Sequence, residues 1–461
     1  MSGLKTISPI DGSVYVERAF ASGSEIQQTL ERAKTAQKQW QATSIEERAA
    51  YCRKAVEAFV AKRDEIGKEI CWQMGRPIRY AAGEVAGFEE RALHMIAIAE
   101  EALAPVSLPE KQDFERWIQR EPLGTVFVVA PWNYPYLTAV NAIMPAIMAG
   151  NTVVLKHSAQ TPLCAERIAE AFAAAGLPEG VFQYLHLSHE ATEQVMQSPV
   201  VDYVAFTGSV AGGRMVEQAI AGRFIGAGLE LGGKDPAYVR ADADIHHAVE
   251  TTIDGAFFNS GQSCCGIERI YVHEDLYEAF VEKAVALVGT YKLGRSDDDE
   301  VTLGPVVKAS AAEFVREQIR EAVEQGAVAH INLGDFPLDK PGTTYLAPQV
   351  LTNVNHTMRI MTEESFGPVV GIQKVSSDEE AIALMNDSEY GLTASVFTQD
   401  IEAGIAIGQQ VETGTFFLNR CDYLDPALAW TGVKNSGRGC TLSKLGYESL
   451  TRPKSFHIKK N

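Results

Sequence analysis

The sequence predicts an α/β protein built on parallel, doubly wound sheets. The alternation of strand-like and helical segments predicts the fold class, and the chain length bears on the number of domains. Short apolar runs rich in β-branched residues, such as 125–130 and 151–156, alternate with stretches of helical periodicity. Repeated strand–helix units place parallel strands in one sheet, with the helices on its faces. The chain of 461 residues is also long enough for two or three domains with separate cores.

The first half begins with a strand-and-turn lead-in over residues 1–20. A helix is expected from about Ser24 to Trp40, with Ser24 as N-cap and Gln27 as its capping-box partner. Ser44 and Glu47 have the same spacing and predict a second helix start, and helical periodicity then continues to about residue 104. Strands are expected at 116–120, 126–129, 151–156, 181–186 and 202–206, and helices at 165–175 and from about residue 212.

The alternation restarts after the paired glycines Gly232 and Gly233. This restart indicates a second α/β domain. Strands are expected at 237–239, 269–273 and 414–418, a pair of strands within 361–375, and a half-exposed strand at 454–460. Helices are expected at 245–259, 276–290, 310–325 and 377–387.

Composition excludes several classes of partner. A net charge of −19 argues against nucleic acid and against an anionic membrane surface. No uncharged apolar run is long enough to span a bilayer, and the first residues lack a secretory apolar region. Seven cysteines without a Cys-x-x-Cys pair predict reduced thiols, a cytoplasmic location and no metal site.

Two stretches carry the predicted chemistry. Residues 257–266, Phe-Phe-Asn-Ser-Gly-Gln-Ser-Cys-Cys-Gly, place Cys264 on a turn, where a thiol can be exposed and activated. Residues 229–236, Leu-Glu-Leu-Gly-Gly-Lys-Asp-Pro, place Glu230 just before a paired-glycine break. A thiol nucleophile and a separately held carboxylate can together attack a carbonyl and hydrolyse the resulting thioester.

These stretches resemble the aldehyde dehydrogenase superfamily. The resemblance continues in family order through 131–133 (Pro-Trp-Asn), Lys156, 206–209 (Phe-Thr-Gly-Ser), 364–368 (Glu-Ser-Phe-Gly-Pro), Asn419 and 432–437 (Gly-Val-Lys-Asn-Ser-Gly). It implies a Rossmann-like cofactor domain at 1–103 and 123–232, a catalytic domain at 233–433, and a small β arm at 104–122 and 448–461. The arm would pair with another subunit, which implies a homodimer or a dimer of dimers.

The resemblance also assigns the chemistry. Cys264 takes the nucleophile position of Gly-Gln-x-Cys, Glu230 that of the general base, and Asn133 that of the oxyanion donor, together with the backbone N–H of Cys264. CoA-acylating relatives generally lack the base, so Glu230 disfavours that reaction. The presence of the nucleophile, the base and the oxyanion donor together also disfavours a non-catalytic binding or structural protein of this fold.

The implied cofactor is NAD, with NADP also tolerated. The turn 208–213 follows a strand and opens a helix, where a phosphate group binds favourably. Members strict for NAD often carry Glu three residues after the lysine, but here that position is Ala159, which removes a repulsion toward a 2′-phosphate. The cofactor-binding residues implied are Pro131, Trp132, Lys156, Ser158, Ala159, Gly208, Ser209, Gly213, Leu231, Gly232, Glu364 and Phe366.

The substrate is expected to be an apolar, aromatic or amino-aldehyde. Succinate-semialdehyde enzymes usually carry arginines where this chain has Asn141 and Phe258, which argues against a carboxylate tail. Succinate semialdehyde stays the alternative. Asp422 and Asp425 favour an amino-aldehyde as much as they favour a solvated loop. The residues expected to line the substrate tunnel are Tyr136, Asn141, Phe258, Cys421 and Trp430.

Overall fold

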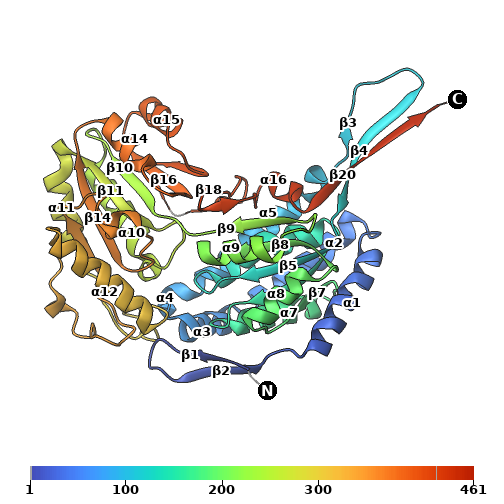
Figure 1. Cartoon of the computed structure of the whole chain (residues 1–461), viewed down its shortest axis with the longest axis horizontal. Coiled ribbons are helices and arrows are strands. Elements are labelled where there is room, and N and C mark those ends of the chain that lie inside the picture. The colour runs from blue at the N-terminus through green and yellow to red at the C-terminus, as the bar shows by residue number, and fades with distance from the viewer. Residues whose placement is uncertain (1–2, 422, 461) are drawn as a thin grey trace.

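The computed structural model describes residues 3–421 and 423–460. Two α/β lobes lie side by side, and a long β arm projects from one of them with the C-terminus near its tip (Figure 1). This confirms the α/β class predicted from the alternation of strands and helices. Within the described ranges, no helix combines the length and the apolar character needed to cross a bilayer.

The first lobe contains a six-stranded sheet in the order β19-β9-β8-β5-β6-β7. Its strands β5 to β9 are parallel, while the short β19 joins the edge antiparallel to β9. All six residues of β5 are buried, as expected for a central strand covered on both faces. The strands are β5 (Thr125–Ala130), β6 (Thr152–His157), β7 (Phe182–Tyr184), β8 (Val201–Thr207), β9 (Gly226–Glu230) and β19 (Gly437–Arg438).

Helices cover both faces of this sheet (Figure 1). The apolar stretch that contains Pro145 forms a helix buried along nearly all its length, with Pro135 in its first turn, where proline fits. The helices are α1 (Gly23–Trp40), α2 (Ile45–Val60), α3 (Arg63–Met74), α4 (Ile78–Ala81), α5 (Gly83–Ala102), α6 (Pro135–Met148), α7 (Pro162–Ala174), α8 (His189–Gln197), α9 (Val210–Ala219) and α16 (Leu445–Glu448).

The second lobe contains a seven-stranded sheet in the order β12-β13-β14-β11-β10-β16-β17. It is parallel except for β12 at one edge. Its strands are β10 (Asp235–Val239), β11 (Ile267–His273), β12 (Val328–Ala329), β13 (Gln349–Thr352), β14 (Val369–Val375), β16 (Thr393–Phe397) and β17 (Thr415–Leu418). Its helices are α10 (Ile245–Phe257), η1 (Phe258–Gly261), α11 (Glu274–Val288), α12 (Ala309–Glu324), η2 (Leu333–Asp335), α13 (Arg359–Thr362), α14 (Asp378–Asn386) and α15 (Ile401–Gly408).

The arm is a three-stranded antiparallel sheet in the order β20-β4-β3. Its strands are β3 (Val106–Ser107), β4 (Phe114–Pro122) and β20 (Thr451–Lys459), and β20 pairs with β4 along its whole length. Two short ribbons complete the fold, β1 (Gly3–Ile7) with β2 (Val14–Ala19), and β15 (Tyr390–Gly391) with β18 (Val433–Lys434). The β15–β18 ribbon pairs residues 433–434 with residues 390–391, and β19 pairs residues 437–438 with β9 of the first lobe. The predicted end of the catalytic domain at residue 433 stays a prediction.

Several elements differ from the sequence-based expectations. The N-cap of α1 is Ser22, not Ser24, and its capping-box partner is Glu25. Residues 361–375 form the end of α13, a loop and the single strand β14 rather than two strands. The structure also adds β9, β13, β16, α8 and α15, which no local sequence pattern predicted.

The two serines at the start of α1 offer a matched stability test. Ser22 accepts a hydrogen bond from the N–H of Glu25, and the Glu25 carboxylate accepts one from the N–H of Ser22. We expect Ser22→Ala to lower the free energy of unfolding by about 1 kcal/mol, because it leaves helix N–H groups without an acceptor. Ser24→Ala should change it much less, as measured by urea unfolding followed by circular dichroism. Equal losses in the two variants would contradict the assignment of the cap.

Candidate active site

The loop that carries Cys264 leaves α10 through three residues in the left-handed region. Asn259, Ser260 and Gly261 have φ values of 54°, 58° and 71°. A side chain at Gly261 would place its Cβ 2.2 Å from the carbonyl oxygen of Gly367, so only glycine fits. The chain therefore turns sharply within η1 and presents Cys264, which is half-buried, to a cavity between the lobes.

Buried amides hold this loop in place. Asn259 Nδ2 donates to the carbonyl of Gln262 at 3.2 Å, and Gln262 Nε2 donates back to the carbonyl of Asn259 at 3.0 Å. The Gln262 carbonyl also accepts from Asn133 Nδ2 at 3.2 Å. The predicted oxyanion donor thus lies one hydrogen bond away from the cysteine loop, although Asn133 belongs to the other lobe.

A buried ion pair fixes the backbone around Asn133. Arg76 and Glu84 pair with each other in the interior, and Arg76 Nη2 donates to the Asn133 carbonyl at 2.5 Å. Glu84 Oε1 accepts from the N–H groups of Tyr136 and Leu137, both at 3.0 Å. These N–H groups belong to the first turn of α6, which has no side-chain cap of its own, so Glu84 supplies the missing acceptor.

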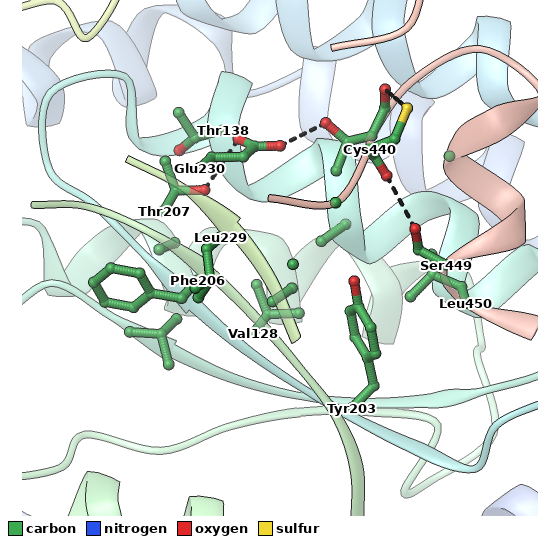
Figure 2. A pocket seen from close by; sticks show the side chains of 18 of the residues that line it. Val128, Thr138, Tyr203, Phe206, Thr207, Leu229, Glu230, Cys440, Ser449 and Leu450 are labelled. Atoms are coloured by element: carbon green, nitrogen blue, oxygen red, sulfur yellow. Dashed lines mark hydrogen bonds between the residues drawn. The ribbon is translucent and has the colours of Figure 1, made fainter. Parts of the chain in front are cut away.

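Glu230 is the last residue of β9, and two hydroxyl groups hold its carboxylate (Figure 2). Thr207 donates to Oε2 at 3.1 Å and Thr441 donates to Oε1 at 2.5 Å. Burial raises the pKa of the Glu230 carboxyl, whereas the two threonine hydrogen bonds and the charge of Arg91 act in the opposite direction. The carboxylate is therefore confined, buried and basic, but its hydrogen bonds still favour the ionised form.

A second, much smaller cavity lies behind Glu230 (Figure 2). Its volume is about 30 Å³, enough for a water molecule, and its lining includes Glu230, Thr441, Tyr203 and Ser449. Cys440 also lines this small cavity. Burial, and to a smaller extent the negative charge of Glu230, raise the pKa of its thiol to about 11. Cys440 is therefore a poor nucleophile at neutral pH.

The main cavity has a volume of about 280 Å³ and contains both predicted catalytic side chains. It brings Cys264 and Glu230 together with the predicted lining residues Asn141, Phe258 and Trp430. The rest of its lining is Arg76, Tyr80, Gly83, Glu84, Gly87, Glu90, Arg91, Tyr134, Leu137, Thr138, Ser263, Cys265, Tyr423 and Leu424.

Two predicted lining residues lie elsewhere, contrary to the sequence-based expectation. Tyr136 is 0% exposed and packs its ring against Phe59 and Phe88 in the core of the first lobe. The thiol of Cys421 donates to the carbonyl of Thr251 on α10, outside the cavity. Asp425 lines a different pocket, and Asp422 lies outside the described residues.

The predicted nucleotide-binding residues gather at one edge of the first sheet. β5, β6, β8 and β9 are parallel, so the loops after them meet at their carboxyl ends. Ser209 caps α9 by accepting from the N–H of Gly212 at 3.2 Å, and Gly213 packs against Leu231. Lys156 lies near the end of β6, where burial lowers the pKa of its ammonium group. Pro131 and Trp132 follow β5, and Ser158 and Ala159 follow β6.

Glu364 faces the same edge from the second lobe. Its Oε1 accepts from the N–H of Gly233 at 3.0 Å, and a Cβ at Gly232 would lie only 2.4 Å from that oxygen. Burial, and then the charge of Glu268, raise the pKa of Glu364 to about 7. Phe366, two residues on, packs edge-to-face against Trp132 with 5.7 Å between ring centroids.

Charged residues that no local sequence pattern predicts support these groups. Lys234 and Glu268 form a buried ion pair at 2.6 Å, and Glu268 also accepts from the N–H groups of Ser365 and Phe366. Arg76, Glu84 and Arg91 were likewise not anticipated. Each acts through contacts with segments remote in the sequence, so no local pattern marks it.

Comparison with known proteins shows the family of this chain. The model of the aldehyde dehydrogenase family matches residues 2–456. An aldehyde dehydrogenase of Paenarthrobacter nicotinovorans is 35% identical over 455 residues, which cover 98% of this chain and 99% of that protein. An NADP⁺-dependent succinate-semialdehyde dehydrogenase of Deinococcus radiodurans is 34% identical over 450 residues, which cover 97% of this chain and 93% of that protein.

Solved structures show the same likeness. The succinic semialdehyde dehydrogenase of Streptococcus pyogenes, determined with NADP⁺, superposes with a TM-score of 0.94 at 30% identity, covering 99% of this chain and 100% of that one. An aldehyde dehydrogenase of Brucella melitensis superposes with a TM-score of 0.96 at 28% identity, and the match covers 100% of this chain and 94% of that one. On these matches and its fold, the chain belongs to the aldehyde dehydrogenase family.

Proposed function

We propose that this protein oxidises an aldehyde to a carboxylic acid with NAD or NADP as acceptor, using Cys264, Glu230 and Asn133. The observation that carries the proposal is the shared cavity. Cys264 from the second lobe and Glu230 from the first open into one space of about 280 Å³, although 34 positions separate them along the chain. Membership of the aldehyde dehydrogenase family supports the same reaction.

Cys264 would carry the first half of the reaction. Its thiolate adds to the aldehyde carbon, and the carbonyl oxygen becomes an oxyanion. Asn133 already donates to the carbonyl of Gln262 in the cysteine loop, so its amide lies close to the atoms that react. Together with the backbone N–H of Cys264, it would hold that oxyanion. Loss of hydride from the former aldehyde carbon then leaves a thioester on Cys264.

Glu230 would carry the second half. Its carboxylate removes a proton from water as the water attacks the thioester, releasing the acid and restoring the thiolate of Cys264. A buried carboxyl with a raised pKa is a stronger base than one in solvent. The hydroxyls of Thr207 and Thr441 hold it in place without neutralising it, because a hydroxyl donates a hydrogen bond but carries no charge.

The residues at the edge of the first sheet fit a dinucleotide. The ten-residue helix α9 presents its N-terminus after a glycine turn, which suits a pyrophosphate. Glu364 would accept from ribose hydroxyls, and the Trp132–Phe366 pair would flank the reactive ring, which accepts the hydride when bound. Lys156, Ser158 and Ala159 would surround the adenosine ribose. No carboxylate occupies position 159, so a 2′-phosphate is tolerated there.

The arm supports a proposal about assembly. β20 and β3 are the two edges of the arm sheet, and each leaves one row of backbone groups unpaired within the described chain. Edge strands of this kind pair readily with another chain. We propose that the arm joins subunits into a homodimer or a dimer of dimers.

The roles of the two adjacent cysteines can be separated by substitution. We expect Cys264→Ala to abolish the burst of reduced cofactor with propanal or benzaldehyde, with kcat falling at least about a thousandfold, because no thioester forms. Cys265→Ala, the matched control, should keep most of the activity. Stopped-flow absorbance at 340 nm without added CoA measures both. Turnover that requires CoA would favour the acylating reaction, and a burst retained in Cys264→Ala would refute the mechanism.

The hydrogen bond from Thr441 gives a pH prediction. This bond stabilises the carboxylate of Glu230, so Thr441→Val should raise its pKa further. Since the base works only when ionised, activity would then be lost at a higher pH as the pH falls. The acidic limb of the kcat profile should shift upward in Thr441→Val and stay in place in Thr441→Ser, which keeps the hydroxyl. An unshifted limb in Thr441→Val would remove Glu230 from the role of base.

Cofactor choice can be tested at position 159. We expect the protein to use NAD and to retain measurable kcat/KM with NADP. Ala159→Glu should depress kcat/KM for NADP by at least about tenfold relative to NAD, because a carboxylate there repels a 2′-phosphate. A strong NADP preference in the unsubstituted protein would contradict NAD as the principal acceptor.

A further inference from the structure

Arg91 places a buried positive charge on the wall of the main cavity. It lies on α5 and is only 7% exposed. Its Nη1 donates to the carbonyl of Leu137 at 2.7 Å and to Oδ1 of Asn141 at 3.2 Å, and both acceptors are uncharged. Among residues 3–421 and 423–460, no carboxylate oxygen lies within 4.0 Å of its nitrogens.

The nearby carboxylates are engaged elsewhere. Three of them influence the ionisation of Arg91 from a distance: Glu84, Glu230 and Glu90. Glu84 pairs with Arg76, Glu230 accepts from two threonines, and Glu90 accepts from the hydroxyl of Tyr423 at 2.5 Å. A buried charge without a close counterion is costly, so it usually marks a functional site.

Asn141 adds an unsatisfied donor beside Arg91. Its side chain is 2% exposed, and its Nδ2 has no hydrogen-bond partner in the described part of the chain. The orientation of the amide is fixed, because a guanidinium has only donors and must therefore meet Oδ1. Arg91 on α5 and Asn141 on α6 thus bring a cation and a buried N–H donor to the same cavity as Cys264.

We propose that Arg91 and Asn141 bind the carboxylate at the far end of an acidic aldehyde. A planar carboxylate matches the N–H donors of one guanidinium and one amide, and it supplies the missing negative charge. The apolar middle of such a substrate would lie against Tyr80, Phe258 and Trp430. This inference rests on the proposed function and names the substrate class of that same site.

The inference revises the expectation drawn from the sequence. Positions 141 and 258 lack arginine, which is why the sequence alone disfavours an acidic substrate. In the structure, a different helix supplies the guanidinium, and Asn141 orients it. An amino-aldehyde would need a free carboxylate, but Glu90 is already bound to Tyr423.

The test compares acidic aldehydes with neutral aldehydes of the same shape. Succinate semialdehyde and 4-methylpentanal form one pair, and 4-carboxybenzaldehyde and 4-isopropylbenzaldehyde form the other. We expect kcat/KM to favour the acid by at least about tenfold in at least one pair, as a charge-assisted hydrogen bond allows. Arg91→Gln should reduce that ratio at least about tenfold. The ratio is the relevant quantity, because any effect of Arg91 on Glu230 is common to both substrates and cancels.

Two further variants keep the test decisive. Arg91→Lys retains the positive charge but loses the fork of donors, so it should keep part of the preference. Asn141→Asp has nearly the same shape as asparagine and keeps the acceptor for Arg91, but its charge neutralises the guanidinium. It should remove the preference for the acid even if Arg91→Gln fails to fold, as thermal unfolding will show.

The remaining outcomes each decide the question. A wild-type protein that prefers the neutral aldehyde of both pairs, or 4-aminobutanal over all four, overturns the inference. So does an unchanged ratio in Asn141→Asp. In each of those cases a burst of reduced cofactor that depends on Cys264 leaves the proposed function intact. If no aldehyde gives such a burst, the proposed function itself fails.

Discussion

The buried ion pair between Arg76 and Glu84 is the constraint on which the site depends. Through Arg76 it fixes the carbonyl of Asn133 and the side chain of Asn259, and through Glu84 it caps α6. One pair thus positions the predicted oxyanion donor of the first lobe and the cysteine loop of the second. Removing one partner of such a buried pair leaves an uncompensated charge and costs about 3–5 kcal/mol, whereas replacing both partners by well-packed apolar residues is often neutral. The pair therefore supplies geometry more than net stability.

Two carboxyl groups on either side of the lobe boundary are controlled in different ways. Glu230 is held by neutral hydroxyls, so its environment confines it but leaves its negative charge available. Glu364 lies near another carboxylate, Glu268, which is itself paired with Lys234. Burial raises the pKa of both groups, yet only Glu364 also experiences repulsion from a like charge. Burial thus acts on both groups in the same direction, but the charge of a neighbouring carboxylate acts on Glu364 alone.

Local sequence pattern predicted the elements that are marked by a continuous apolar run or by a helix-capping spacing. The apolar runs of β5 and β6 and the Ser44–Glu47 spacing of α2 were confirmed within a residue or two. β9 was not predicted, because Gly226 and Gly228 lower its strand propensity and only pairing with β8 defines it. The start of α1 was misplaced by two residues, because Ser22 and Ser24 both fit the cap pattern. The cavity wall was the hardest part to predict, since Arg91 reaches Asn141 across 50 positions.

The paired glycines after β9 connect the two sheets. A Cβ at Gly232 would collide with Glu364, and one at Gly233 would lie 2.6 Å from the carbonyl oxygen of Cys264. One passage of the chain from the first lobe to the second therefore runs between the Glu364 carboxyl and the backbone of Cys264. Bulk added at either glycine would press on the Glu364 carboxyl or on the backbone of Cys264, so this crossing leaves no room for a side chain.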